Sequence, residues 1–498
     1  MRIGSLIVAS AARPLRRRLS PFAVLCLAPV LGGCLLTADN PDPLIDIPTF
    51  YSGGPHTKHG AEIALPPLDW WHAFHSPELT ALIEQARESN LDIAAAVARI
   101  VQADAQSRIT GAALLPTVDL GGSATRSRSS QNINNTGVGG NAGVGGGKDR
   151  VVYSASLSAS YEIDFWGKNR AALRAAEESA VAARYDREVV GLSTVVSVAN
   201  AYFQVLATQD RLRVARNNLT SATRVLALIK QRLAAGTASE LDTAQQESVV
   251  NNIRASIPPL EQTLRQNQIA LGILLGMSPE RVKIHGGSLR SIAIPRVTPG
   301  LPSELLAQRP DIRQAEANLA AANANVQNAR TQLLPSITLT GEGGYQSAAL
   351  KALLEPQSAF YNIAAGLTQP IFHGGEILGN IDLQKGRQDE LVQTYRKAVI
   401  SAFGDIETAL SAVRRTAEAE RLEAQVVASS QRAFNISEER LREGTVDLVT
   451  VLQTQQTLYQ AQDALVQARL TKFQAIVSLY QALGGGWLPK PVEAMNAR

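Results

Sequence analysis

The chain has 498 residues, of which 45% are apolar, 18% charged and 5% aromatic. Intrinsically disordered chains have fewer apolar residues and a larger charge imbalance, so this composition excludes disorder. A polytopic helical membrane protein is excluded too, because the one long apolar run lies at the N-terminus. The formal charge of +4 depends on five arginines in residues 1–33, which contain no acid. The remainder is nearly neutral, which argues against nucleic acid as a partner.

The N-terminal residues 1–33 are predicted to form a lipoprotein signal peptide. Four arginines precede a short apolar stretch at residues 19–30, which is too short to span a membrane stably. Leu31-Gly32-Gly33-Cys34 then resembles a bacterial lipobox, in which cleavage before the cysteine leaves a thiol that carries a lipid anchor. The alternative is an ordinary signal peptide followed by a cysteine at that place by chance.

Cysteine usage supports lipidation of Cys34. Cys26 lies within the signal peptide, so Cys34 is the single cysteine of the mature chain and no intramolecular disulfide is expected. Each buried methylene group of an attached acyl chain adds about 0.8 kcal/mol of membrane affinity, so several chains anchor a protein stably. Leu35 follows the cysteine. In lipoproteins of this kind an aspartate there would indicate inner-membrane retention, so the outer membrane is the expected location.

The rest of the chain is predicted to contain two internal repeats, each with a helix, two strands and two long helices. Leu114-Leu115-Pro116 recurs 219 residues later as Leu333-Leu334-Pro335, whereas Arg232-Leu233 recurs 208 residues later as Arg440-Leu441. The shorter offset means that the first repeat has additional residues, and the glycine-rich stretch at residues 137–147 predicts a longer loop there. The predicted divisions are residues 1–33 (signal peptide), 34–72 (lipidated N-terminal segment), 73–276 (first repeat), 277–302 (linker), 303–486 (second repeat) and 487–498 (C-terminal tail).

Four strands are expected, two in each repeat. From Tyr153 to Phe165 every odd position is apolar and every even position is polar, and this period of two predicts a long strand. Pro116 and Pro335 indicate where the preceding helix gives way to a strand. The predicted strands lie at about residues 117–126, 151–165, 336–346 and 360–371.

Long helices are expected to follow each strand pair, because residues 168–257 and 371–488 contain no proline. Residues 168–233 would measure about 100 Å as one helix. The sequences Gly236-Thr237 and Gly444-Thr445 predict a turn between two antiparallel helices. Ser239 or Asp242 in the first repeat, and Asp447 in the second, are predicted to cap the returning helix.

The strand number sets the expected assembly. Four strands cannot close a barrel, which needs about eight, and an open edge in lipid leaves backbone groups unpaired. Identical copies are therefore expected to pool their strands. Two copies would fill an eight-stranded barrel with side chains, whereas three would give twelve strands and an aqueous lumen. The polar alternate face, with Glu162 and Asp164, favours water inside. With a lipid on Cys34 and a helical tube below, the expected object is a conduit from the outer membrane across the periplasm.

Several motifs in fixed order then indicate a family. They are Trp70-Trp71-x-x-Phe74, Phe165-Trp166-Gly167-Lys168, Arg309-Pro310-Asp311-Ile312, Gln369-Pro370-Ile371-Phe372 and Leu483-Gly484-Gly485-Gly486-Trp487. Over roughly residues 65–488 the chain resembles the TolC-type outer membrane factors, in the lipid-anchored branch that serves drug efflux pumps. The resemblance implies a mainly α protein that forms a homotrimer. Each protomer would give four strands to a twelve-stranded membrane β-barrel and long helices to a periplasmic α-helical barrel. It also implies a periplasmic adaptor protein and an inner-membrane pump as partners, with no cofactor and no enzyme activity.

The resemblance further implies a periplasmic closure made by rings of residues in the second helical hairpin. Aligned on Gly444, the apolar constriction falls on Val449 and the acidic ring on Gln453. Gln453 carries no charge and departs from the family pattern, so Asp447 becomes the candidate for a substitute negative ring. The alternative is that Asp447 only caps its helix and Gln453 faces solvent.

No metal site or catalytic site is predicted. His56-x-x-His59 and His72-x-x-His75 lack a third ligand and lie in a region expected to be loop-like. The chain has neither a phosphate-binding glycine loop nor a nucleophile elbow. Within transport, an exit duct for protein secretion or metal efflux stays open as an alternative. From a different class, the chain could be a lipid-anchored structural tether of coiled helices.

Overall fold

The structure is a computed structural model that describes residues 67–128, 149–281, 284–285, 287–295, 308–485 and 487. Its contacts divide the chain into two compact units. The sheet unit comprises the described parts of Ala113–Ala172 together with Asn323–Lys385, and the helical unit comprises the described parts of Pro41–Ala112, Leu173–Ala322 and Gly386–Arg498. The predicted lipidation site Cys34 and the predicted loop at residues 137–147 lie outside the described residues.

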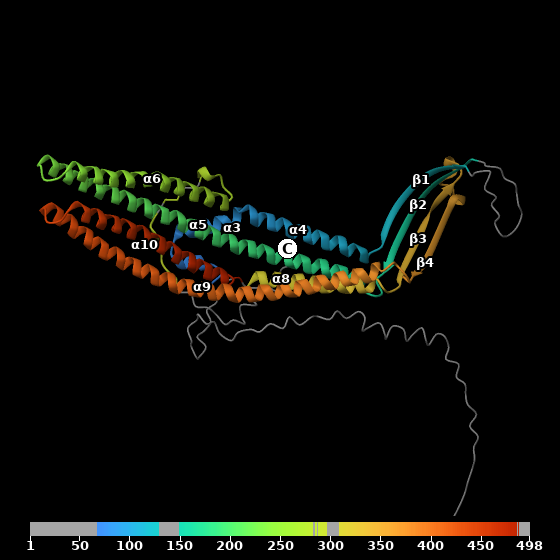
Figure 1. The fold of residues 1–498 in the computed structure, drawn as a ribbon. Helices are drawn as coiled ribbons and strands as arrows, with labels where there is room; N and C mark the ends of the chain where they lie inside the picture. The colour runs from blue at the N-terminus through green and yellow to red at the C-terminus, as the bar shows by residue number, and fades with distance from the viewer. Residues whose placement is uncertain are drawn as a thin grey trace, which may run out of the picture. The chain divides into compact units, whose positions relative to one another are not determined.

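The sheet unit contains four antiparallel strands that follow one another in the order of the sequence (Figure 1). β1 pairs with β2, β2 with β3, and β3 with β4. The prediction of four strands is therefore confirmed. The strands are β1 (Thr117–Arg128), β2 (Asp149–Ile163), β3 (Ser336–Ser347) and β4 (Ala359–Thr368).

Two predicted strands extend beyond the observed ends, β2 by two residues (165 against 163) and β4 by three (371 against 368). β2 ends at Ile163 because the Asp164 carboxylate accepts hydrogen bonds from the backbone amides of Asn169 and Arg170, both at 3.0 Å, and so starts the next helix. β4 ends at Thr368 because Pro370 has no amide hydrogen to continue the ladder. The remaining strand ends agree with the prediction to within two residues.

Two helical hairpins make up most of the described chain. The first consists of α5 (Lys168–Ala234) and α6 (Glu240–Leu274), and the second of α9 (Glu376–Glu443) and α10 (Leu448–Ala482). The turns lie at Gly236 and Gly444, as predicted. Of the described helices, only α5 has an 18-residue stretch apolar enough to cross a membrane, and 56% of that stretch is buried within the structure, which fits a core helix. The shorter helices are α3 (Pro77–Ser89), α4 (Leu91–Gly111) and α8 (Pro310–Thr331).

The helical unit has a core of aromatic rings in contact with one another. Trp70 and Phe74, in the 3-10 helix η1 (Trp70–Phe74), are almost fully buried. The ring centroids of Trp70 and Tyr480 lie 4.7 Å apart, and those of Phe203 and Phe473 lie 4.9 Å apart. The expectation of a loop around His72 is therefore wrong, because the neighbouring tryptophans bury enough surface to order the segment.

Part of the predicted linker, residues 277–302, packs on the same core. Two 3-10 helices lie in this range, η3 (Pro279–Arg281) and η4 (Leu289–Ser291). The side chain of Leu289 is 1% exposed and joins the aromatic cluster. The buried carboxylate of Asp210 accepts hydrogen bonds from the Leu289 amide and the Ser288 hydroxyl, both at 3.0 Å. The division into repeats and linker stays a prediction.

A largely buried cluster of charged side chains joins α9 to α10. The Glu420 carboxylate lies 2.7 Å from Arg469 Nε and 2.8 Å from Lys472 Nζ, and the three side chains are only 15–16% exposed. Burial acts to raise the pKa of Glu420, but the hydrogen bonds from Lys472 and Arg469 outweigh burial and lower that pKa below its usual 4.5. The ionised form of Glu420 therefore stabilises the hairpin at neutral pH.

We expect Glu420→Gln to lower the free energy of unfolding at pH 7 by about 1–3 kcal/mol, because Arg469 and Lys472 would stay buried without a counter-charge. Since the folded state lowers the pKa of Glu420, its contribution is complete above pH 4.5 and is lost as the pH falls further. In thermal melts between pH 7 and pH 3, the melting temperatures of the wild-type protein and of Glu420→Gln should therefore converge as the pH falls. Glu418→Gln, which removes an exposed partner of Arg415, should change stability by about 0–1 kcal/mol. A Glu420→Gln deficit that stays constant across this range would contradict the assignment.

Candidate functional site

The register of the sheet separates two chemically different faces. Residues directly opposite each other in an antiparallel pair project to the same face. Leu120 lies opposite Leu157, Leu157 opposite Gly343, and Gly343 opposite Tyr361. Following these pairs gives one apolar face, consisting of Val118, Leu120, Gly122, Ala124, Tyr153, Ala155, Leu157, Ala159, Tyr161, Ile163, Ile337, Leu339, Gly341, Gly343, Tyr345, Ala359, Tyr361, Ile363, Ala365 and Leu367.

This apolar face is not covered by the described residues of the chain. Leu120, Tyr361 and Ile363 are each more than 80% exposed. From Tyr153 to Ile163 the band extends about 33 Å along the strand, at roughly 3.3 Å per residue. A strand tilt of about 40° reduces this to about 25 Å, the height of the apolar band on membrane β-barrels. An exposed apolar face of this height fits the hydrocarbon of a bilayer.

The opposite face of the sheet, here called the polar face, carries hydroxyl, amide and carboxylate groups. The register aligns Asp119, Ser158, Glu342 and Asn362 in one row across the four strands. Ser123 and Ser154 share a hydrogen bond of 2.9 Å between their hydroxyls. Such a face is stable against water and would be costly against lipid. The alternation predicted for β2 therefore extends across the whole sheet.

The sheet is open at both edges in the described structure. β1 and β4 each have a single hydrogen-bonded neighbour. Lipid offers no hydrogen bonds to an edge strand, and each unpaired backbone group there costs several kcal/mol. A lone sheet of this kind cannot stay in a membrane, so the expectation that one chain does not close a barrel is confirmed.

The second feature of the site lies in the helical unit, where both hairpins turn. The Thr237 amide donates to the Arg232 carbonyl at 2.8 Å and the Gly236 amide to the Leu233 carbonyl at 2.9 Å, which closes a Schellman motif. Gly444 and Thr445 close the second hairpin with the same pair of bonds. The glycines have φ angles of 74° and 77°, a left-handed conformation that other residues adopt only with strain.

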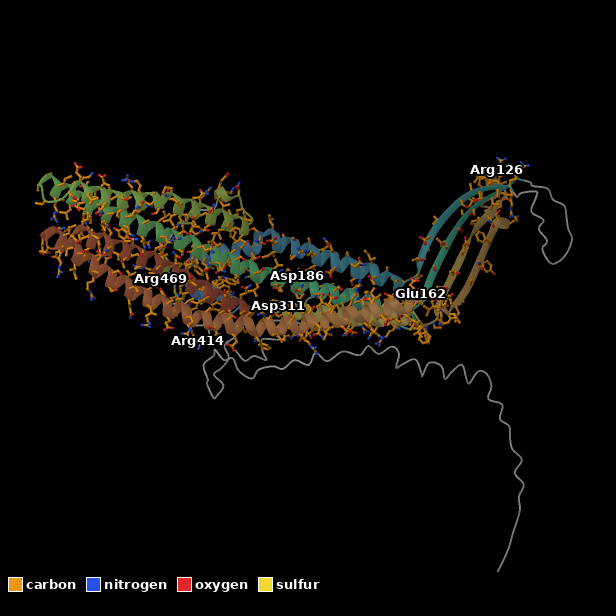
Figure 2. All side chains as sticks on the ribbon, in the orientation of Figure 1. Arg126, Glu162, Asp186, Asp311, Arg414 and Arg469 are labelled. Atoms are coloured by element: carbon orange, nitrogen blue, oxygen red, sulfur yellow. The ribbon has the colours of Figure 1, made fainter. Side chains whose placement is uncertain are left out.

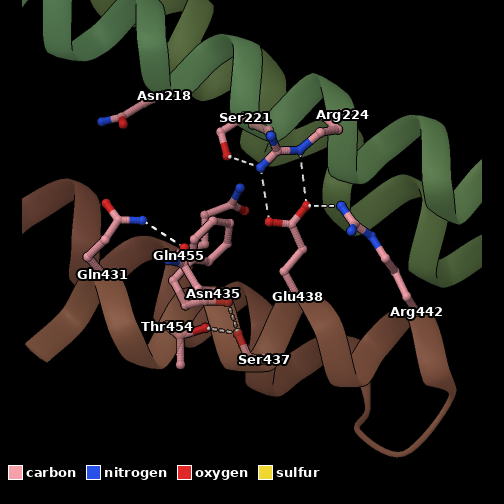
Figure 3. A network of polar contacts seen from close by, with 12 residues as sticks. Asn218, Ser221, Arg224, Gln431, Asn435, Ser437, Glu438, Arg442, Thr454 and Gln455 are labelled. Carbon is pink, nitrogen blue, oxygen red and sulfur yellow. Dashed lines mark hydrogen bonds and ion pairs between the residues drawn. The ribbon is translucent and has the colours of Figure 1, made fainter.

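A polar network joins the first hairpin to the second (Figure 3). Arg224 of α5 donates through Nε and Nη2 to both carboxylate oxygens of Glu438 in α9, at 3.0 and 2.9 Å. Arg442 Nη2 donates to the same carboxylate at 2.9 Å. Glu438 is only 8% exposed, so one buried carboxylate holds two guanidinium groups. A bidentate pair of this kind fixes the position of one helix along the other.

Around this network lie apolar contacts and further hydrogen bonds. Val225 and Ile229 of α5 pack in one buried cluster with Phe434 of α9 and Val451 of α10. The Tyr459 hydroxyl donates to the Asn218 carbonyl at 3.0 Å. The side-chain Nε2 of Gln246 donates to the Ala222 carbonyl at 2.9 Å, and to Oε1 of Gln455 in α10 at 3.5 Å. The sequence does not single out this network, because charged and amide side chains recur along all four helices.

The three residues predicted for the periplasmic closure lie on the exposed side of the start of α10. Asp447 caps α10, because its carboxylate accepts the Thr450 amide at 2.9 Å, and the predicted capping role is confirmed. Hydrogen bonds from the Thr450 hydroxyl and amide lower the pKa of Asp447, so it is ionised at neutral pH. Val449 is 49% exposed, and Gln453, one turn further on, is exposed as well. The structure thus brings Val449 and Gln453 onto one surface of the helix.

Metal binding has no support in the described residues, where no three His, Cys, Asp or Glu side chains lie close enough together to hold an ion. His72 instead lies 3.0 Å from Asp69, three residues earlier in the chain.

The two features match a known family. Its model, described as outer membrane efflux protein, matches residues 82–277 and 301–485. The chain belongs to the outer membrane efflux protein family. Among curated relatives, the pyoverdine export outer membrane protein OpmQ of Pseudomonas putida is 41% identical over 468 residues, which cover 93% of this chain and 97% of the relative. The probable efflux pump outer membrane protein TtgC of Pseudomonas putida is 32% identical over 470 residues, covering 93% and 95%.

Solved structures agree with the relatives. The outer-membrane channel OprN has a TM-score of 0.83 and 25% identity, and the match covers 91% of this chain and all of that chain. The Campylobacter jejuni CmeC outer membrane channel has a TM-score of 0.84 and 26% identity, covering 93% and 97%. The predictions of the TolC-type fold and of an outer membrane efflux channel are therefore confirmed.

We expect Arg224→Gln to destabilise the joined hairpins by about 1–3 kcal/mol, because the buried Glu438 carboxylate loses its bidentate partner. The loss should appear as faster amide hydrogen exchange near both turns. Arg415→Gln removes a guanidinium from an exposed pair with Glu418 and should cost about 0–1 kcal/mol. If the two variants exchange at the same rates near the turns, the network does not hold the hairpins together.

Proposed function

We propose that three copies of this chain join their open sheets into a twelve-stranded barrel in the outer membrane and their long helices into a tube below it. The open sheet with an exposed apolar face carries this proposal. Pairing β1 of one copy with β4 of the next satisfies both edges. Twelve strands leave an aqueous lumen, whereas eight are filled by side chains. The apolar face then lies against lipid and the polar face lines the passage.

The assembled object is a passive conduit in a three-part efflux system. An inner-membrane pump would supply the energy and a periplasmic adaptor would connect it to this chain. Names of relatives include pyoverdine export, toluene efflux and antibiotic efflux, all of which concern small organic molecules. We therefore propose small organic molecules as substrates and place siderophore export first, because the relatives of 41% identity are pyoverdine exporters. A conduit of this kind needs no chemistry of its own.

A lipid on Cys34 would hold each protomer to the outer membrane. The support is the sequence Leu31-Gly32-Gly33-Cys34 after an apolar stretch, and the absence of any other cysteine beyond the signal peptide. Radiolabelled palmitate should be incorporated into the wild-type protein and not into Cys34→Ser. Labelling that survives Cys34→Ser would contradict this assignment.

We further propose that Val449, Gln453 and Asp447 line the periplasmic closure. The support is their exposure on the first turns of α10, next to the hairpin turn. In three copies, Val449 would form the apolar constriction and Asp447 a ring of negative charge. Asn caps helices about as well as Asp, so Asp447→Asn removes the charge and keeps the cap.

The closure predicts two separable changes in planar bilayers. Val449→Ser should raise single-channel conductance because a polar constriction is easier to hydrate, whereas Val426→Ser, at another exposed position, should not. Asp447→Asn should reduce the preference for cations without changing thermal stability. Unchanged selectivity in Asp447→Asn would mean that the carboxylate serves only as a cap.

The transport function predicts a phenotype in the source bacterium. Deleting the gene should lower secretion of siderophores or raise sensitivity to antibiotics and toluene, and a plasmid copy should restore the wild-type level. Sensitivity to divalent metal ions and secretion of proteins should be measured as well. A change in either would indicate a metal-efflux or secretion duct rather than export of small organic molecules. A deletion that changes none of these would count against a transport role.

A further inference from the structure

Charged side chains return to the apolar face at one end of the sheet. Within the described strands, that face carries no charge from Ile163 to Tyr153. The next residues along it are Arg126, opposite Val151, and Arg128, opposite Asp149. Figure 2 shows Arg126 at one end of the sheet and Glu162 towards the other. The two arginines therefore mark one border of the apolar band, at the end of the sheet where β1 ends and β2 begins.

The charges at this border do not balance. Arg126 donates to Asp149 Oδ2 through Nε at 3.2 Å and through Nη2 at 2.5 Å, and Arg128 Nε lies 3.9 Å from Asp149 Oδ1. The arginine side chains are 73% and 67% exposed. Among the described residues, a single carboxylate thus faces two guanidinium groups. Arg150, opposite Ser127, belongs to the other face of the sheet.

The height of these arginines matches a membrane surface. Val151, opposite Arg126, lies twelve residues from Ile163, which is about 40 Å along the strand and about 30 Å along the barrel axis after tilt. The hydrocarbon band of such barrels is about 25 Å tall, so Arg126 lies just beyond it. On the same face, Tyr153 lies in the next row of the sheet and Tyr345 in the row after that, at a height where tyrosines commonly border the headgroup layer.

We propose that Arg126 and Arg128 bind the phosphate groups of phosphorylated lipids in the outer leaflet. A guanidinium presents paired donors that match phosphate oxygens. Asp149 takes Nε and Nη2 of Arg126, but both arginine side chains are largely exposed, so a phosphate can reach their other donors. The site rests on the proposed function, because that function places the apolar face against lipid. In a trimer it occurs three times around the barrel. Each bound lipid would fix the height of the barrel in the membrane.

The test uses the full-length trimer in detergent, with native mass spectrometry to measure lipid binding. Bisphosphorylated lipid A should bind at least about tenfold more tightly than its dephosphorylated form, as expected when charge-assisted hydrogen bonds are lost. Arg126→Gln/Arg128→Gln should abolish this preference. Arg150→Gln removes the same charge from the other face of the same strand end and should keep it.

Asp149→Asn gives a result of opposite sign that a folding defect cannot imitate. It removes the competing carboxylate and should tighten lipid A binding several-fold. Inorganic phosphate, at a concentration equal to that of the lipid phosphate, should not displace lipid A. Equal binding of the two lipids, an equal loss in Arg150→Gln, or displacement by inorganic phosphate would each overturn the proposal. A protein that forms no trimer and no channel would refute the proposed function, whereas a conducting trimer without phosphate preference would refute this inference alone.

Discussion

The rest of the structure depends on the pairing of backbone groups at the two edges of one four-stranded sheet. β1 and β4 each have one neighbour, and the face between them exposes Leu120, Tyr361 and Ile363. That face is stable in lipid, yet lipid is the solvent in which an unpaired edge costs most. In the proposed trimer, identical copies would resolve the conflict, because each would supply the edge that its neighbour lacks.

The helical unit meets a different requirement, which is to keep long helices in fixed register. Apolar contacts such as Val225 with Phe434 are weakly directional, so helices joined by them alone can slide. The bidentate Arg224–Glu438 pair resists sliding because its hydrogen bonds break when either helix shifts. Burying the Glu438 carboxylate costs desolvation, and we infer that the benefit of the pair is positional accuracy near the turns.

Local patterns in the sequence predicted what local physics determines. The alternation from Tyr153 to Phe165 predicted β2 and its two faces, and the glycines Gly236 and Gly444 predicted both turns. The alternation extended β2 two residues too far, because the Asp164 carboxylate satisfies amides five and six residues later, which no period of two reveals. The Arg224–Glu438 pair was not predicted, since its partners lie 214 residues apart and meet only after both hairpins pack.

The central claim is that three chains share one barrel, and particle images of the full-length protein in detergent test it most directly. We expect three-fold symmetric particles in which β1 of each protomer pairs with β4 of the next and four strands come from each chain. Monomeric particles, or a barrel closed within one or two chains, would contradict the account.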